Sequence, residues 1–142
     1  MRKSKLLIPL LCFALIIIIF RFVIFIGYVP SESMEPTIHA GDMIVGTRIF
    51  CDLNVGNIII FERGNRIMVK RIVACPGDTI YLLGKKTKVP QDCYYVLGDN
   101  SANSFDSRYW KDPYVKRNDV IAKLLKITMI ICENKRLCCN TA

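Results

Sequence analysis

Two serine hydroxyls lie one residue apart in the stretch SESMEPTI, residues 31–38, shortly after a long apolar run. A serine becomes an effective nucleophile only when a nearby base removes its proton. Histidine is the usual base, but His39 is the only histidine of the chain, and it follows Ser33 in the same predicted loop. No acid is placed to orient its imidazole, so we interpret His39 as a surface residue.

A lysine that has lost its proton is the alternative base. Free lysine has a pKa of about 10.4, so its amine must be desolvated to act as a base at neutral pH. The segment RIMVKRIVACPGD surrounds Lys70 with apolar residues. In an extended strand, Met68, Lys70 and Ile72 would share one face. This pattern fits a buried basic lysine, and it also fits an edge-strand lysine that discourages aggregation.

The elements that must position these groups begin with an apolar run over residues 6–26, interrupted by Pro9 and Arg21. A helix of that length spans about 30 Å, close to the thickness of one bilayer core. Basic residues precede the run, which predicts a cytoplasmic N-terminus and an extracytoplasmic remainder. A cleavable signal peptide is the alternative, but its apolar core is shorter, about 7–15 residues. We therefore expect residues 1–27 to form an uncleaved transmembrane anchor.

Beyond the anchor, short apolar or alternating runs are separated by turn sequences such as HAGD, CPGD and GDNSANS. About six strands at this spacing predict a mainly β domain, a compact antiparallel sandwich or barrel. We expect this domain over residues 28–131 and a Cys-rich tail over 132–142. The run VIAKLLKITMII at 120–131 is too short and too charged for a second membrane span, so we predict a strand there.

The formal net charge is +8 at pH 7, and half of it lies in the first 31 residues, which contain no acid. The other basic residues are scattered and lack a cluster of stackable aromatics, so no nucleic-acid binding is expected. Six of the seven cysteines follow the apolar run, and the sequence selects no pairing among them. The terminal CENKRLCC lacks the spacer and the histidine partner of a zinc site, so no metal site is predicted.

Five motifs follow the apolar run in order: SESMEPTI, GDMIVGTR, GNIIIF, MVKRIVACPGD and GDNSANSFDSRYW. From the anchor to about Lys126, the chain resembles the type I signal peptidases, bacterial membrane-anchored serine peptidases with a Ser–Lys dyad. It is similar to their minimal Gram-positive form, without the inserted cap domain of some relatives. The resemblance implies cleavage after small residues to release signal peptides at the outer face of the cytoplasmic membrane, without a cofactor. The implied partners are preprotein signal peptides, the lipid bilayer and the protein export translocon.

The resemblance also assigns roles by position. It implies that Ser33 is the nucleophile, that Lys70 is the general base and that Ser31 contributes to the oxyanion hole. Ser104 matches a serine that orients the lysine. Supporting positions correspond to Arg71, Asp99, Asn100, Asp106 and Arg108. Substrate side chains would be held by Val29, Met34, Ile38, Met68 and Val69.

Alternatives of three kinds remain. A Ser–Lys peptidase dedicated to one substrate, such as a pilin, would carry the same motifs. The self-cleaving repressors of the DNA-damage response share the dyad, but they cut ahead of the serine, whereas the only Ala-Gly pair here, Ala40–Gly41, follows Ser33. An inactive membrane-tethered binding domain should have lost Ser33 or Lys70, and both are present. Glu32 and Glu35 occupy variable positions of the motif, and we expect both to face water.

Overall fold

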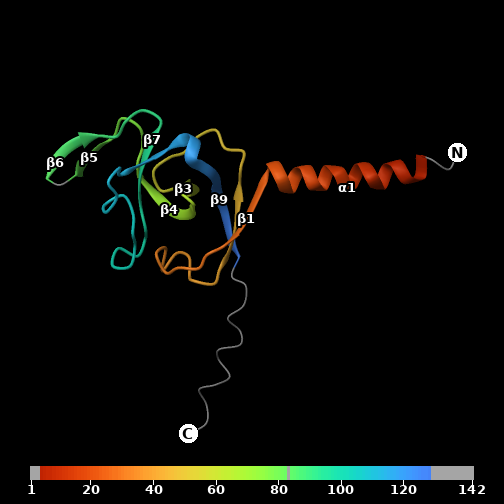
Figure 1. Ribbon diagram of the computed structural model, residues 1–142, viewed down its shortest axis with the longest axis horizontal. Coiled ribbons are helices and arrows are strands. Elements are labelled where there is room, and N and C mark those ends of the chain that lie inside the picture. The colour runs from red at the N-terminus through yellow and green to blue at the C-terminus, as the bar shows by residue number, and fades with distance from the viewer. Residues whose placement is uncertain (1–3, 83, 129–142) are drawn as a thin grey trace, which may run out of the picture.

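The computed structural model describes residues 4–82 and 84–128. These residues form one long helix, nine strands and a short 3₁₀ turn (Figure 1). The helix and the turn are α1 (Ser4–Phe22) and η1 (Arg117–Asp119). The strands are β1 (Ile24–Tyr28), β2 (Met43–Thr47), β3 (Ile58–Arg63), β4 (Arg66–Ala74), β5 (Thr79–Leu82), β6 (Lys85–Lys88), β7 (Cys93–Leu97), β8 (Tyr114–Lys116) and β9 (Val120–Thr128).

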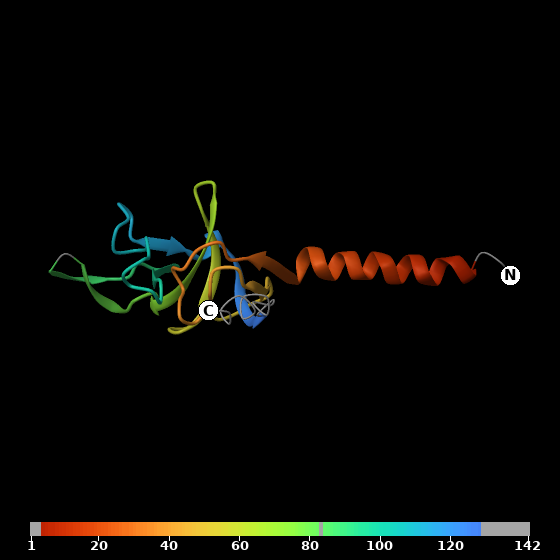
Figure 2. The same ribbon diagram turned by 90° about the horizontal axis from the view of Figure 1, so that it is seen from below.

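The helix α1 projects away from the strands, and the β5–β6 hairpin lies at the opposite end of the molecule (Figures 1 and 2). The apolar side chains of α1 are largely exposed; Leu10 and Phe22, for example, each expose 66% of their surface. Pro9 lies inside the helix rather than in its first turn, because the helix already begins at Ser4. Within the part of the chain that the structure describes, no helix combines the length and the apolar character needed to cross a membrane.

The prediction of one helix through residue 26 is wrong at its C-terminal end. The helix ends at Phe22, and the chain enters β1 at Ile24, inside the segment expected to be the anchor. The reason is tertiary, because Ile24–Tyr28 pairs antiparallel with Met43–Thr47 of β2. The same apolar residues would suit a helix, but their backbone groups find partners in the sheet instead.

The strands pair antiparallel throughout, which confirms the mainly β, antiparallel fold class. Seven of them form one sheet in the order β1-β2-β9-β3-β4-β7-β8, and β5 and β6 form a separate hairpin. The strand predicted at 120–131 is β9 over its described part. The predicted tail at 132–142 lies outside the described residues, and with it Cys132, Cys138 and Cys139. Among the described cysteines, Cys12, Cys51, Cys75 and Cys93 have free thiols.

The central strand β3 is buried on both faces. Ile59 and Phe61 belong to one apolar cluster together with Ile72, Val96 and Trp110. Ile58 and Ile60 belong to a second cluster together with Met34 and Ile38. Successive side chains of a strand point to opposite faces, so the continuous apolar run GNIIIF supplies both clusters at once. This strand anchors its neighbour β4, which carries Lys70 opposite Ile59.

Candidate active site

Ser33 lies in the turn that connects β1 to β2, and the turn is fixed by apolar side chains. Met34 and Ile38 are fully buried in the second cluster, and the Ile38 N–H donates a hydrogen bond to the Met34 carbonyl at 2.9 Å. Met34 and Ile38, four residues apart in SESMEPTI, therefore anchor both halves of this turn in the core. Ser31 remains exposed, whereas Ser33, next to Met34, is 9% exposed.

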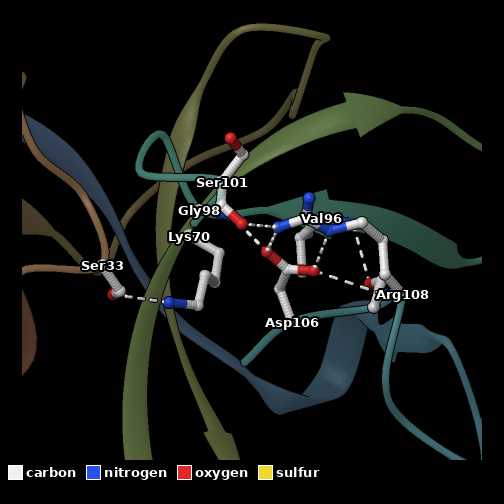
Figure 3. A network of polar contacts seen from close by, with 8 residues as sticks. Ser33, Lys70, Val96, Gly98, Ser101, Asp106 and Arg108 are labelled. Atoms are coloured by element: carbon white, nitrogen blue, oxygen red, sulfur yellow. Dashed lines mark hydrogen bonds and ion pairs between the residues drawn. The ribbon is translucent and has the colours of Figure 1, made fainter. Parts of the chain in front are cut away.

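The Lys70 amine and the Ser33 hydroxyl meet between the turn and β4 (Figure 3). Lys70 Nζ donates a hydrogen bond to Ser33 Oγ at 2.6 Å. Ser33 is 9% exposed and Lys70 only 3% exposed. When the amine is neutral, its lone pair can instead accept the serine proton. The structure thus brings together the two residues that the sequence singles out as nucleophile and base.

The surroundings of Lys70 favour its neutral form. Burial lowers the pKa of the Lys70 amine below its ordinary value, because a charged amine loses hydration there. The carboxylates Asp106 and Asp99 act in the opposite direction, and the Arg108 guanidinium lowers the pKa further. The net direction is downward, which increases the fraction of free base near neutral pH.

Two arginine–carboxylate pairs surround the dyad. Arg71, next to Lys70 in β4, binds Asp99 through Nε at 2.8 Å and Nη2 at 2.6 Å. Arg108 binds the fully buried Asp106 through Nε and Nη2, both at 2.8 Å. The Gly98 N–H donates a further hydrogen bond to Asp106, at 3.0 Å (Figure 3).

Burial by itself would favour the neutral acids in both pairs. Hydrogen bonds from Arg71 nevertheless hold the pKa of Asp99 below its ordinary value. Those from Arg108 and from the Gly98 backbone do the same for Asp106. Both carboxylates therefore stay ionised. Each forms its ion pair with an arginine and not with Lys70.

The remaining predicted polar residues are placed differently. Ser31 is exposed, with its Oγ 3.4 Å from Ser33 Oγ, so a second hydroxyl stands beside the nucleophile. Ser104 is buried, but within the described residues no group lies in hydrogen-bonding geometry with its Oγ, so its expected bond to Lys70 is not formed. Asn100 donates its backbone N–H to the Ser33 carbonyl at 3.1 Å. His39 is exposed, in agreement with its interpretation as a surface residue.

An apolar cavity of about 600 Å³ opens beside the dyad, between the β1 end of the turn and the first half of β4. Of the five residues predicted to hold the substrate, Val29, Met34, Met68 and Val69 line it. Ile38 does not, because the turn directs its side chain into the core, where it is fully buried. Local patterns did not identify the other lining residues, which include Phe25, Tyr28, Ile44, Ile60, Arg66 and Ile67.

Sequence reasoning also missed several contacts around the serines. Glu32 is exposed, as expected, and Asn103 Nδ2 donates a hydrogen bond to its Oε2 at 3.0 Å; Glu35 is half-buried, contrary to the expectation that it faces water. Thr37 Oγ1 accepts a hydrogen bond from Arg71 at 3.3 Å. The segment GDNSANS is rich in turn-forming residues, and that composition does not reveal which side chains reach another segment.

In the described ranges, no group of three or more His, Cys, Asp or Glu side chains could hold a metal ion.

Comparison with known proteins adds independent information. The sequence model of the family described as "Signal peptidase, peptidase S26" matches residues 2–86 and 81–129. The chain is 30% identical to "Signal peptidase I" of Leptolyngbya laminosa over 68% of this chain and 64% of that protein. It is 33% identical to "Signal peptidase I" of Bacillus amyloliquefaciens, over 64% and 69% of the two chains. It is also 28% identical to "Inactive signal peptidase IA" of Staphylococcus aureus, over 84% and 88%.

Proposed function

Because the chain belongs to the signal peptidase family, peptidase S26, we propose that it is a serine endopeptidase that removes signal peptides from exported preproteins. The observation that carries this proposal is the 2.6 Å contact between Ser33 Oγ and the buried amine of Lys70. The chain spans 64% of the length of the Leptolyngbya relative, so the activity is inferred from its own site as well as from the family.

The proposed reaction begins when neutral Lys70 takes the proton of Ser33, whose Oγ attacks the scissile carbonyl carbon. Negative charge then develops on the carbonyl oxygen, where the Ser31 hydroxyl and the Ser33 backbone N–H donate hydrogen bonds. Protonated Lys70 gives its proton to the amine of the departing half of the substrate. The other half stays bound to Ser33 Oγ as an acyl-enzyme. Lys70, neutral again, removes a proton from water, whose oxygen attacks the acyl carbon. The bond from that carbon to Ser33 Oγ breaks, the acid leaves, and Lys70 returns the proton to Oγ.

The surrounding residues keep this chemistry aligned. Arg71 and Asp99 brace the strand that carries the base, and Arg108 neutralises Asp106. Asn100 holds the turn of the nucleophile through the Ser33 carbonyl. We assign Ser104 to orienting the Lys70 amine. Its burial beside Asp106, which acts on the pKa of Lys70, supports this role.

The proposed substrate is a preprotein with small residues before the cut. The cavity beside the dyad supports this because it is lined mainly by apolar side chains, Val29, Met34, Met68 and Val69 among them. An apolar lining disfavours a charged substrate side chain, which would lose its hydration there. The chemistry requires neither a metal nor a cofactor.

We further propose that α1 and the basic residues before it anchor the enzyme in the cytoplasmic membrane, with the N-terminus inside and the peptidase domain outside; residues 24–27, first expected in the anchor, belong to β1 of that domain. The exposed apolar side chains of α1 and the basic residues that precede them support this orientation. The bilayer and the translocon are the corresponding partners. Fractionation of cells followed by protease treatment from the outer face tests the anchor and its orientation.

The proposed reaction is tested by incubating the purified full chain with a preprotein and determining the product masses. We expect one cut after a small residue, absent in both Ser33→Ala and Lys70→Ala. A panel of preproteins separates a general enzyme from one dedicated to a pilin or another single substrate. An inactive binding domain would bind the preproteins and leave them intact.

A further inference from the structure

Glu32, the residue between the two serines, is tied to the loop of residues 98–108. Its carboxylate Oε2 accepts a hydrogen bond from Asn103 Nδ2 at 3.0 Å. Its backbone carbonyl accepts a second one from Asn100 Nδ2, at 3.2 Å. We call Glu32, Asn100 and Asn103 the Glu32 clamp. With the bond from the Asn100 N–H to the Ser33 carbonyl, three hydrogen bonds join this loop to the turn of the nucleophile.

Met34 and Ile38 anchor the turn in the core, and the hydrogen bonds add to this anchoring, because nucleophile and base come from distant parts of the sheet. Ser33 follows β1, an edge strand, whereas β2, β9 and β3 lie between β1 and β4 in the sheet order. The dyad contact is therefore not fixed by neighbouring strands. The turn needs its own connections toward β4.

One end of the turn has such a connection through Thr37, which accepts a hydrogen bond from Arg71 Nη2 at 3.3 Å. The same Arg71 holds Asp99 through two hydrogen bonds, and Asp99 directly precedes Asn100. The Glu32 clamp connects the other end of the turn to this loop. Ser33 thus lies between two connections that both lead back to Arg71, the neighbour of Lys70.

The loop and the turn meet at very short range. A Cβ atom on Gly98 would lie 2.5 Å from the Ser33 carbonyl oxygen and would collide with the Ser104 side chain. The close approach allows the short asparagine side chains to span the gap to Glu32. A carboxylate acceptor makes a stronger hydrogen bond with an amide donor than a neutral oxygen does.

We propose that Glu32 is a positioning residue: through Asn103, its carboxylate holds the Ser33 hydroxyl in line with the Lys70 amine. This inference rests on the proposed peptidase function. Glu32 touches no reacting atom and acts only through the geometry of the turn. A displacement of about 1 Å at reacting atoms can cost on the order of 100-fold in rate.

The test compares the steady-state cleavage of one preprotein by Glu32→Ala, Asn103→Ala and the double variant. We expect each single variant to lower kcat by about 10-fold with KM nearly unchanged, because the substrate cavity is intact. The double variant should lose no more than either single one, since both remove the same bond. Glu32→Gln should keep most of the activity, because its amide oxygen can still accept the hydrogen bond from Asn103 Nδ2.

The matched control is Glu35→Ala, in the same turn, whose side chain makes no hydrogen bond within the described part of the chain. It should cleave like the parent. Thermal unfolding of every variant corrects kcat for any loss of folded protein. Parental kcat in Glu32→Ala, or losses that multiply in the double variant, would overturn the proposal.

A second readout needs no preprotein. Acylation of Ser33 by a penem, followed through the mass of the intact protein, should be about 10-fold slower in Glu32→Ala than in the parent. If the parent is acylated but cleaves no preprotein, the proposed substrate is wrong, and the acylation rates still decide the role of Glu32. Equal acylation rates in parent and variant would contradict the positioning role of Glu32, and they would leave the proposed peptidase function standing.

Discussion

The Lys70 amine lies 2.6 Å from the Ser33 hydroxyl, and both side chains are almost completely buried. The amine belongs to a strand whose position is fixed by β3, whereas the hydroxyl belongs to a turn. A buried amine with a hydroxyl partner is poised to exchange a proton with it once the amine is neutral.

The activity should depend on pH through Lys70. Because burial lowers the pKa of Lys70, and because only the neutral amine accepts the serine proton, kcat/KM should rise with pH through the lowered pKa and then level off. Arg108→Gln removes a cation that lowers this pKa and leaves Asp106 without its counter-ion. The rise should therefore move to higher pH in that variant, in a kcat/KM profile from pH 5 to about 10. An unmoved midpoint would contradict the electrostatic role of Arg108.

Stability should report the same shift of the Lys70 pKa. At neutral pH the unfolded chain binds a proton at Lys70 more readily than the folded one, so folding is penalised there and the penalty shrinks as pH approaches 10.5. Lys70→Met removes the penalty while keeping most of the side-chain volume. Its melting temperature should exceed that of the parent at pH 7, with a smaller difference at about pH 10. A difference independent of pH would mean that Lys70 titrates normally.

Ser31→Ala should reduce kcat by roughly 10²–10³-fold, as expected for the loss of one oxyanion donor. The Ser31 hydroxyl lies 3.4 Å from Ser33 Oγ at the mouth of the cavity. Because this hydroxyl acts on charge that develops in the transition state, KM should change little. Steady-state kinetics with one preprotein measure both constants, and Ser101→Ala, an exposed serine of the neighbouring loop, is the control. A large increase in KM alone would assign Ser31 to substrate binding instead.

Asp99→Asn should destabilise the fold by about 1–3 kcal/mol, because the partly buried Arg71 loses its charged partner. The pair is bidentate, so an amide that offers one oxygen cannot replace it fully. Chemical denaturation measures the change. Asp52→Asn, an exposed carboxylate whose side chain makes no hydrogen bond in the described chain, should unfold like the parent. Equal midpoints for the two variants would show that the pair contributes little.

Much of the site could be predicted from local patterns. The spacing of the serines and the apolar flanks of Lys70 pointed to these residues because a strand or a turn is determined largely by its own residues, whereas Asp106 was assigned only through the family resemblance. The short apolar runs likewise predicted strands, among them the run that forms β3. What the patterns left undecided was which segments lie side by side.

The sequence by itself determined the chemistry on offer: two adjacent hydroxyls, one lysine in an apolar strand, and an antiparallel β framework to carry them. The tertiary structure alone decided that the helix ends at Phe22, that Ile38 faces the core, that Ser104 makes no bond to Lys70 and that Glu32 meets Asn103. The last contact joins residues 71 positions apart, and the dyad joins residues 37 positions apart. Such distances depend on strand order and register, which arise when the whole sheet packs at once and which no short stretch of sequence encodes.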